Sequence, residues 1–192
     1  MSGKGIQILK NGEIYEGEFQ NNQRTGKGKL TEIDGDIYIG QFRFNQRDGN
    51  GIECLIDGSV YDGYWIKDKK SGKGKWSFPD GAVYEGSFLN DEIKGEGYYK
   101  YADGKQYRGS FTSNQRDGFG KYDLGSGLVY EGQFKLGKIT GQGTLSKQGD
   151  YTYKGGFLDG KKHGEGVTTL QNGTVTKAFW ENGVKTKDLP LK

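Results

Sequence analysis

The residues that could carry chemistry are few in this sequence and lie far apart along the chain. His163 is the only histidine and Cys54 the only cysteine, and they are 109 positions apart. A nucleophile and its base must lie within hydrogen-bond reach of each other, so we expect no catalytic dyad here. A lone cysteine also gives no internal disulfide and no cysteine metal cluster. We interpret both residues as structural.

Three other patterns also carry little chemistry. Asp57, Asp80 and Asp103 each precede a glycine at one recurring position, which is typical of turns rather than of acid–base pairs. The Gly-Lys-Gly-Lys runs at 26–29 and 72–75 lack the Gly-Lys-Ser/Thr ending and the following helix of a phosphate loop. The glycosylation pattern at 172–174 falls on another such turn, and we interpret it as chance. We expect no catalytic, cofactor-binding or metal-binding residues, no enzyme activity and no small-molecule substrate.

Composition indicates a folded chain of many short strands. Only 31% of the residues are hydrophobic, but 14% are aromatic, and disordered chains contain few rings. The 36 glycines and 2 prolines favour strands joined by tight turns. A net charge of +3 gives no reason to expect nucleic acid as a partner. Without a long apolar run or a signal peptide, we expect a cytosolic protein.

A pattern with a period of 23 residues accounts for nearly the whole chain. Each repeat has a tyrosine, a glycine two residues later, an aromatic ring two residues after that, and then a Gly-x-Gly pair. A fixed period of this length is the signature of a repeat architecture. The tyrosines are Tyr15, Tyr38, Tyr61, Tyr84, Tyr107, Tyr130 and Tyr153, and the rings are Phe19, Phe42, Trp65, Phe88, Phe111, Phe134 and Phe157.

Two turns separate the strands of each repeat. Asn11-Gly12 opens a series of Asn-Gly and Asp-Gly pairs, for which we expect type I′ hairpin turns. The second turn carries residues that tolerate a left-handed backbone, beginning with Asn22 and Asn45. If Phe19 faces Gly26, then Gly17 faces Gly28, and the two glycines leave a trench that neighbouring rings can cover. A register shift of one residue would turn every side chain to the other face.

The sequence therefore predicts an all-β fold, an elongated single-layer antiparallel meander of β-hairpin repeats. Sixteen strands would give a rod on the order of 75 Å long. We expect the array to span residues 3–184, with an N-terminal half repeat, seven full repeats from Tyr15 and a degenerate last repeat. In that last repeat Thr176, Ala178 and Trp180 replace the tyrosine, the glycine and the ring. The tail at 185–192 leaves the pattern, and either covers the end strand or stays free.

The repeat unit resembles the MORN repeat (membrane occupation and recognition nexus). Residues 157–166, from Phe157 through His163 to Gly166, are similar to the family consensus, and the resemblance covers about residues 3–184. Proteins that resemble this chain include radial spoke head components of motile cilia and other cytoskeletal scaffolds. The resemblance thus implies a repeat rod that docks partner proteins, in a ciliary axoneme or another cytoskeletal assembly. Fold alone does not fix function, so this setting is an analogy.

Two sets of residues are candidates for binding. The middle rings could form a groove for a partner segment, because aromatic anchors dominate interface energies. They are Tyr61, Trp65, Tyr84, Phe88, Tyr107 and Phe111. A second set lies two residues before the Gly-x-Gly pairs and predicts a basic edge, made of Arg24, Arg47, Lys70, Arg116 and Lys162. This edge is either a solvated row of turn residues or a track for acidic protein or lipid headgroups.

Three functions are compatible with these features. We rank first a non-catalytic structural protein that docks partner proteins along the rod. The alternative is a peripheral membrane adaptor that binds anionic phospholipids through the basic edge, although stable anchoring usually needs two signals. A regulatory subunit of an enzyme on another chain ranks third.

Overall fold

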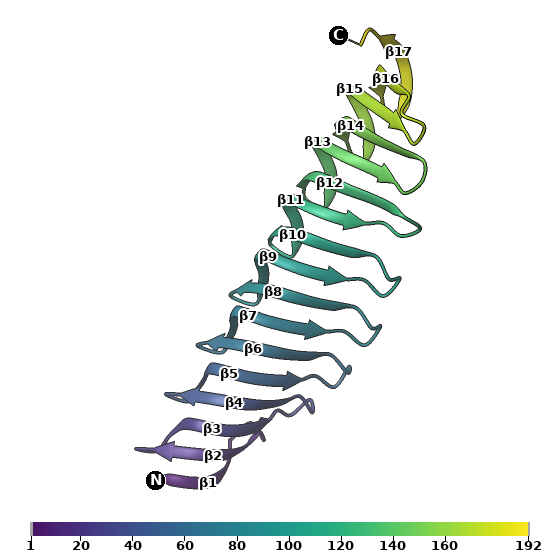
Figure 1. Cartoon of the computed structure of the whole chain (residues 1–192). Helices are drawn as coiled ribbons and strands as arrows, with labels where there is room; N and C mark the ends of the chain where they lie inside the picture. Colours follow the sequence, from purple (N-terminus) through teal and green to yellow (C-terminus); the bar gives the residue numbers. More distant parts are fainter. Residues whose placement is uncertain (1, 192) are drawn as a thin grey trace. The chain divides into compact units, whose positions relative to one another are not determined.

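The computed structural model describes residues 2–191, and those residues form seventeen strands and no helix (Figure 1). The chain divides into two compact units, 1–95 and 96–192, with the boundary inside β9. The first unit holds β1 (Gly3–Ile8), β2 (Ile14–Gln20), β3 (Gln23–Thr31), β4 (Ile37–Arg43), β5 (Gln46–Cys54), β6 (Val60–Ile66), β7 (Lys69–Ser77), β8 (Val83–Leu89) and the start of β9 (Glu92–Lys100). The second holds the rest of β9, β10 (Gln106–Thr112), β11 (Gln115–Asp123), β12 (Leu128–Lys135), β13 (Lys138–Lys147), β14 (Tyr151–Leu158), β15 (Lys161–Leu170), β16 (Val175–Glu181) and β17 (Val184–Leu189).

Strands that follow one another in the chain are hydrogen-bonded neighbours in the sheet, and each pair with a defined register is antiparallel. The predicted all-β meander of hairpin repeats is confirmed. The sixteen expected strands are β1 to β16. The seventeenth, β17, is formed largely by the tail, which pairs with β16 from Lys177↔Leu189 to Glu181↔Val184. The tail therefore covers the end strand.

The two turn types are exchanged relative to the sequence prediction. Asn21 and Asn22 form a two-residue loop between β2 and β3, with φ of 50° and 60°. Positive φ at both central residues is the requirement of a type I′ turn, so this turn has that geometry. At the Asn11-Gly12 pair only the glycine has positive φ, and Gly12 N donates to Leu9 O at 3.0 Å. The expected type I′ turn is wrong at this position, which is a type I turn closed by a left-handed glycine.

The glycines face one another across successive strands. Gly17 lies opposite Gly28 as predicted, and Gly28 lies opposite Gly40 on the next strand. The predicted pairing of Phe19 with Gly26 is wrong, because a bulge after Gly17 places Phe19 opposite Arg24. Gly26 instead lies opposite Phe42 of the next repeat. The same bulge recurs in the hairpins β4–β5, β6–β7, β10–β11, β12–β13 and β14–β15, in both units.

The tyrosine of each repeat covers its own pair of glycines. A Cβ on Gly63 would lie 2.5 Å from Tyr61 Cζ and 2.7 Å from Gly74 Cα, so only glycine fits there. The Tyr61 hydroxyl donates to the backbone oxygen of Tyr64 at 3.1 Å. The other six repeat tyrosines make the equivalent bond three residues along the chain. The predicted trench is present, and the ring in it belongs to the same hairpin.

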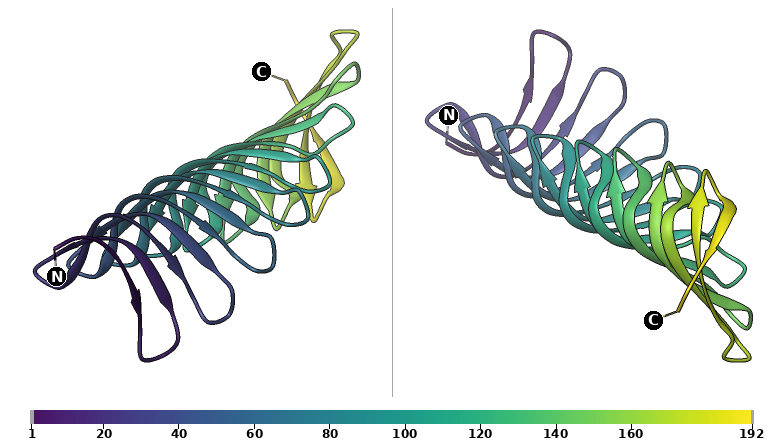
Figure 2. Two further views of the ribbon diagram at one scale, coloured as in Figure 1. Left: turned by 90° about the horizontal axis from the view of Figure 1, so that it is seen from below. Right: turned by 90° about the horizontal axis from the view of Figure 1, so that it is seen from above.

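The tyrosines and the repeat rings share one face of the sheet, which we call the inner face. Tyr15 makes edge-to-face contacts with Phe19 at 5.2 Å and with Phe42 of the next repeat at 4.9 Å. Residues four apart on a straight strand would lie about 13 Å apart. The contact between Tyr15 and Phe19 therefore requires the strand to bend at Gly17, and Figure 2 shows the strands curving in this way.

Candidate functional site

The bulge determines where the basic residues of each hairpin point. Residues directly opposite each other in an antiparallel pair project from the same face. Because the bulge places Arg24, Arg47 and Lys70 opposite Phe19, Phe42 and Trp65, their side chains lie on the inner face. Arg116 and Lys162 lie opposite Phe111 and Phe157 in the same way. We call the five residues Arg24, Arg47, Lys70, Arg116 and Lys162 the cationic row.

The cationic row stacks on aromatic rings instead of forming an exposed edge. The Arg47 guanidinium lies 4.4 Å from the Trp65 ring centroid, and the Lys70 ammonium lies 4.2 Å from that of Trp76. Lys70 is only 8% exposed. Stacking of this kind stabilises a cation where water is partly removed. The prediction that these residues form a basic edge at the turns is therefore corrected, because the bulge shifts the register by two residues and moves them from the turn into the ladder, opposite the rings.

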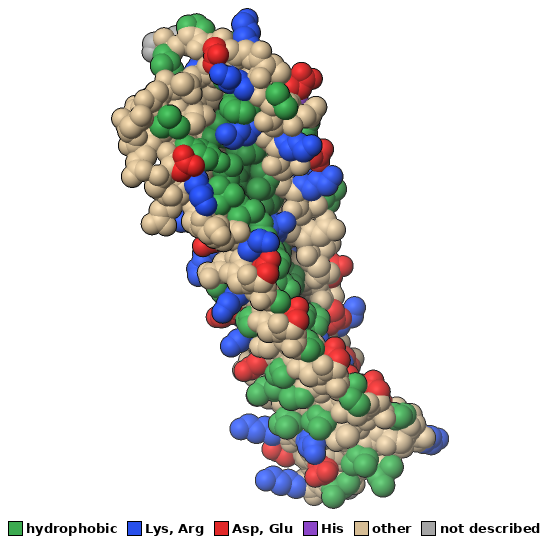
Figure 3. Space-filling view, turned by 90° about the vertical axis from the view of Figure 1, so that its right-hand side faces the viewer, with side chains coloured by type: hydrophobic (Ala, Val, Ile, Leu, Met, Phe, Trp, Pro, Cys, Tyr) green, Lys and Arg blue, Asp and Glu red, His purple; other side chains and the backbone are tan. Residues whose placement is uncertain are grey.

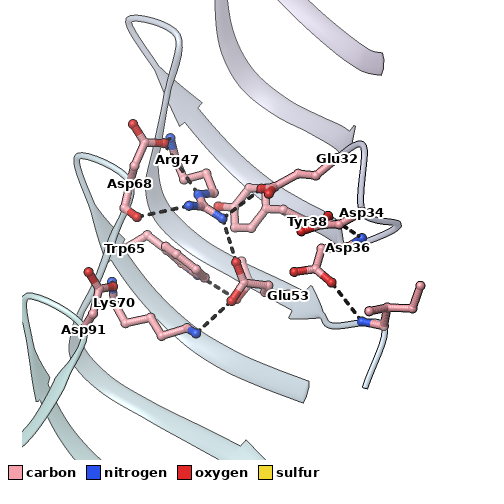
Figure 4. Close-up of polar contacts among 12 residues, drawn as sticks. Glu32, Asp34, Asp36, Tyr38, Arg47, Glu53, Trp65, Asp68, Lys70 and Asp91 are labelled. Atoms are coloured by element: carbon pink, nitrogen blue, oxygen red, sulfur yellow. Dashed lines mark hydrogen bonds and ion pairs between the residues drawn. The ribbon is translucent and has the colours of Figure 1, made fainter. Parts of the chain in front are cut away.

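One buried carboxylate joins two members of the row in the first unit. Glu53, 7% exposed, accepts from Arg47 Nη1 at 2.6 Å and pairs with Lys70 Nζ at 2.8 Å (Figure 4). Arg47 also reaches Glu32 at 3.4 Å and Asp68 at 3.5 Å. A buried charge is tolerated when it is paired and hydrogen-bonded, and this network meets that condition.

The other members of the row lack such a carboxylate. Arg24 Nη2 donates to Asn45 O at 2.6 Å, and Arg116 Nη2 donates to Gly137 O at 2.7 Å. The Nη1 atoms of both arginines are buried without a hydrogen-bond partner among the described residues. Lys162 lies among rings, and burial lowers the pKa of its ammonium group below the usual range.

The six rings predicted to bind a partner lie in the core. Each of them is 0–4% exposed, which leaves almost no ring area for a partner. In the first unit Tyr61 and Tyr84 both contact Phe88, at 5.0 and 5.1 Å, and Trp65 contacts Tyr61. In the second unit Tyr107 contacts Phe111 at 5.1 Å. Their type and period identified the core of the repeat.

A second layer of rings on the inner face is only half-buried. In the first unit Trp76 stacks on Phe78 at 5.2 Å. In the second unit Tyr101 lies 4.5 Å from Tyr99 and 5.8 Å from Tyr122. Figure 3 shows hydrophobic side chains gathered in a hollow of the second unit. Sequence reasoning missed this layer, although its residues recur two and four positions after the Gly-x-Gly pairs.

The carboxylates that could bind a metal ion accept hydrogen bonds or face a cation within the fold, and the cysteine and the histidine lie in different units. Glu32, Asp34 and Asp36 place carboxylate oxygens within 4.8 Å of one another. Asp34 accepts from Asp36 N in its own turn at 3.2 Å, Asp36 accepts from Ile56 N in the turn of the next repeat at 2.8 Å, and Glu32 faces Arg47. Burial raises the pKa of Glu32. Cys54 is exposed in the first unit, and His163 lies in β15 of the second.

The comparisons with solved structures bear on the fold. The chain is similar to the SAS-4 TCP domain of Drosophila melanogaster, solved with a proline-rich motif of Ana2, at a TM-score of 0.53 and 8% identity over 92% of this chain and 90% of that one. It is also similar to the G-box domain of the microcephaly protein CPAP, at a TM-score of 0.47 and 16% identity over 93% and 100%. Identities this low show a shared fold alone, and the second score is too low to carry an argument.

The sequence comparisons identify the repeat. No curated protein sequence matches the chain. Among residues 2–191 there is no helix long and apolar enough to cross a membrane. The MORN repeat matches residues 15–37, 38–60, 61–83, 84–106, 107–129, 130–151 and 153–175. These seven consecutive matches cover most of the described hairpins, and the chain belongs to the MORN repeat family.

Proposed function

We propose that this chain is a non-catalytic scaffold that docks partner proteins on its inner face. The observation that carries this proposal is the half-buried ring layer, represented in the second unit by Tyr99, Tyr101 and Tyr122. Aromatic side chains that stay partly open on a regular sheet are suited to anchor a partner segment. The docking surface thus lies above the fully buried rings, which support it from below.

We place the scaffold in a cytoskeletal assembly, such as a ciliary axoneme with a radial spoke head. Membership of the MORN repeat family supports a scaffold role. The SAS-4 domain that shares the fold was solved with a proline-rich motif of another protein, which supports protein partners for this architecture. The ciliary setting itself follows the resemblance to radial spoke head proteins and is part of the proposal.

A matched pair of ring substitutions tests the docking surface. Tyr101→Ser and Tyr122→Ser remove half-buried rings of the inner face, whereas Phe119→Ser removes a 63% exposed ring from the opposite face of β11. Proximity labelling of the tagged chain in cells identifies partners, and each purified partner is then tested against the variants. We expect the two inner-face variants to lose at least tenfold in affinity, and Phe119→Ser to bind normally.

The result also separates the two rival functions. The membrane-adaptor alternative depends on an exposed basic edge, and the cationic row lies over rings instead. Co-sedimentation with phosphatidylserine vesicles measures that alternative directly. If the chain binds vesicles, and its partner proteins bind the two inner-face variants as well as the parent, the protein-docking proposal is wrong.

A further inference from the structure

We propose that Lys162, on the inner face of the second unit, binds a carboxylate from an acidic segment of a partner protein. This inference rests on the proposed docking function and names the chemistry of the docked segment. It follows from comparing Lys162 with Lys70, which occupies the same position of the repeat 92 residues earlier, four repeat lengths away.

Lys70 shows how a carboxylate is held at this position. Its ammonium lies over the rings of Trp76, Tyr61 and Trp65, at 4.2, 5.2 and 5.6 Å, and pairs with Glu53 at 2.8 Å. Rings beneath the ammonium exclude water from one side, and the carboxylate supplies the acceptor on the other. The chain itself therefore contains an occupied version of the site.

Lys162 has the rings and lacks the carboxylate. Its ammonium lies 4.4 Å from the Tyr153 ring, 4.5 Å from Trp180 and 5.0 Å from Tyr151. The position equivalent to Glu53 is Leu145, which has no acceptor. Among residues 2–191, nothing pairs with or accepts from Lys162 Nζ. The side chain is half-buried, so the ammonium is partly desolvated but still reachable.

A carboxylate fits this site better than a phospholipid headgroup does. Phosphate recognition normally uses several donors that converge on one group. The lysines on the strands next to Trp180 are already engaged, since Lys185, which lies opposite Trp180, pairs with Asp188 at 2.8 Å, and Lys177 pairs with Glu165 at 2.7 Å. Lys162 thus offers one isolated charge above apolar rings. A Glu or Asp side chain with apolar neighbours matches both features.

A titration followed by NMR tests this site with a defined probe. The probe is acetyl-Leu-Glu-Leu-amide, added up to about 10 mM because contacts of this size bind in the millimolar range. Its control is acetyl-Leu-Gln-Leu-amide. The chain has three tryptophans, and their indole N–H signals report three places: Trp180 at the proposed site, and Trp65 and Trp76 beside Lys70. We expect the Glu peptide alone to shift the Trp180 signal, and the other two signals to stay unchanged.

Three variants make the site falsifiable. Lys162→Met keeps an unbranched side chain over the rings without charge, and it should abolish the Trp180 shift. Leu145→Glu should fill the site from within the chain, raise the pKa of Lys162 and block the peptide. Leu145→Gln is its uncharged control and should leave binding intact. A Trp180 shift that survives in Lys162→Met, that the Gln peptide reproduces, or that is absent in the parent protein overturns the proposal.

Two further outcomes are distinguishable. Binding of phosphatidylserine vesicles that disappears in Lys162→Met would assign the site to lipid and would refute a protein carboxylate. The second outcome is that Tyr101→Ser abolishes the binding of partner proteins, whereas Lys162→Met binds them as tightly as the parent protein does. The scaffold function would then stand, and the acidic-segment inference would be wrong.

Discussion

Replacing one glycine of the inner face with alanine tests how the rings and the glycines fit together. In Gly63→Ala the new Cβ would lie 2.5 Å from Tyr61 Cζ and 2.7 Å from Gly74 Cα. Real Cβ atoms do not approach other atoms this closely, so the Tyr61 ring must move. The strand on the other side is held by its ladder of hydrogen bonds, and the ring is therefore the part that yields.

The loss of unfolding free energy in Gly63→Ala can be summed from the contacts that Tyr61 makes. Moving the ring breaks the hydroxyl bond to Tyr64 O, about 1 kcal/mol. It also disturbs edge-to-face contacts with Trp65 and Phe88, each about 0.5–1.5 kcal/mol. Overpacking adds about 1–3 kcal/mol. Since these contributions overlap, we expect a loss of roughly 3–5 kcal/mol in the free energy of unfolding.

Gly81→Ala is the matched control. Gly81 has φ of +87°, and nothing lies within 4 Å of a Cβ built on it. Alanine there meets only backbone strain, about 1–2 kcal/mol. Urea denaturation followed by tryptophan fluorescence measures both variants, and Trp65 lies beside the disturbed ring. If Gly63→Ala is no less stable than Gly81→Ala, the glycines are not needed to admit the tyrosine, and the reasoning fails.

Three further outcomes are expected. Glu53→Gln should cost about 3–5 kcal/mol of unfolding free energy in urea denaturation, because Arg47 and Lys70 lose their buried carboxylate; a loss below 1 kcal/mol would contradict this. Leu136 is 67% exposed and has a φ of 48°, so Leu136→Gly should relieve backbone strain and raise the free energy of unfolding by about 1 kcal/mol. A melting temperature below that of the parent protein would refute this prediction. Burial raises the pKa of Tyr130 from 10.0 to about 12, so its stabilising contribution, complete below pH 10, should be lost as pH rises toward 12. Absorbance at the tyrosinate band should then show ionisation together with unfolding, and ionisation of all tyrosines near pH 10 in the folded protein would disprove it.

The sequence predicted the repeat and its core because both depend on residue type at a fixed period. Tyr15 and Phe19 recur every 23 residues, and their burial follows from that pattern. The pairing of Gly17 with Gly28 could also be predicted from the sequence, because only glycine lets two strands approach this closely. These features depend only on residue type and spacing, and both can be read directly from the sequence.

The positions of Arg24 and Lys70 could not be predicted, because they depend on the bulge. Two extra residues in β3, Gly26 and Lys27, shift the register by two, which places Arg24 opposite Phe19 on the inner face instead of in the turn. The spacing of the glycines is compatible with either register, and nothing local to Arg24 selects one. The exchange of turn types has a similar origin, since Asn-Gly suits both a type I′ turn and a type I turn closed by glycine.

The way one tyrosine joins two repeats also determines where such an array can end. Within each unit a tyrosine contacts the ring of its own repeat and the ring of the next, as Tyr153 contacts Phe157 and Trp180. At position 176 a threonine stands in place of the tyrosine, so β16 supplies no repeat tyrosine to contact Trp180. Lengthening the array by one repeat would thus need Thr176→Tyr, Ala178→Gly and a new 23-residue segment whose first strand takes the place of β17 beside β16. Duplication or deletion of a 23-residue segment would then change the length of the array by one whole repeat. The ring contacts between the remaining repeats would stay the same.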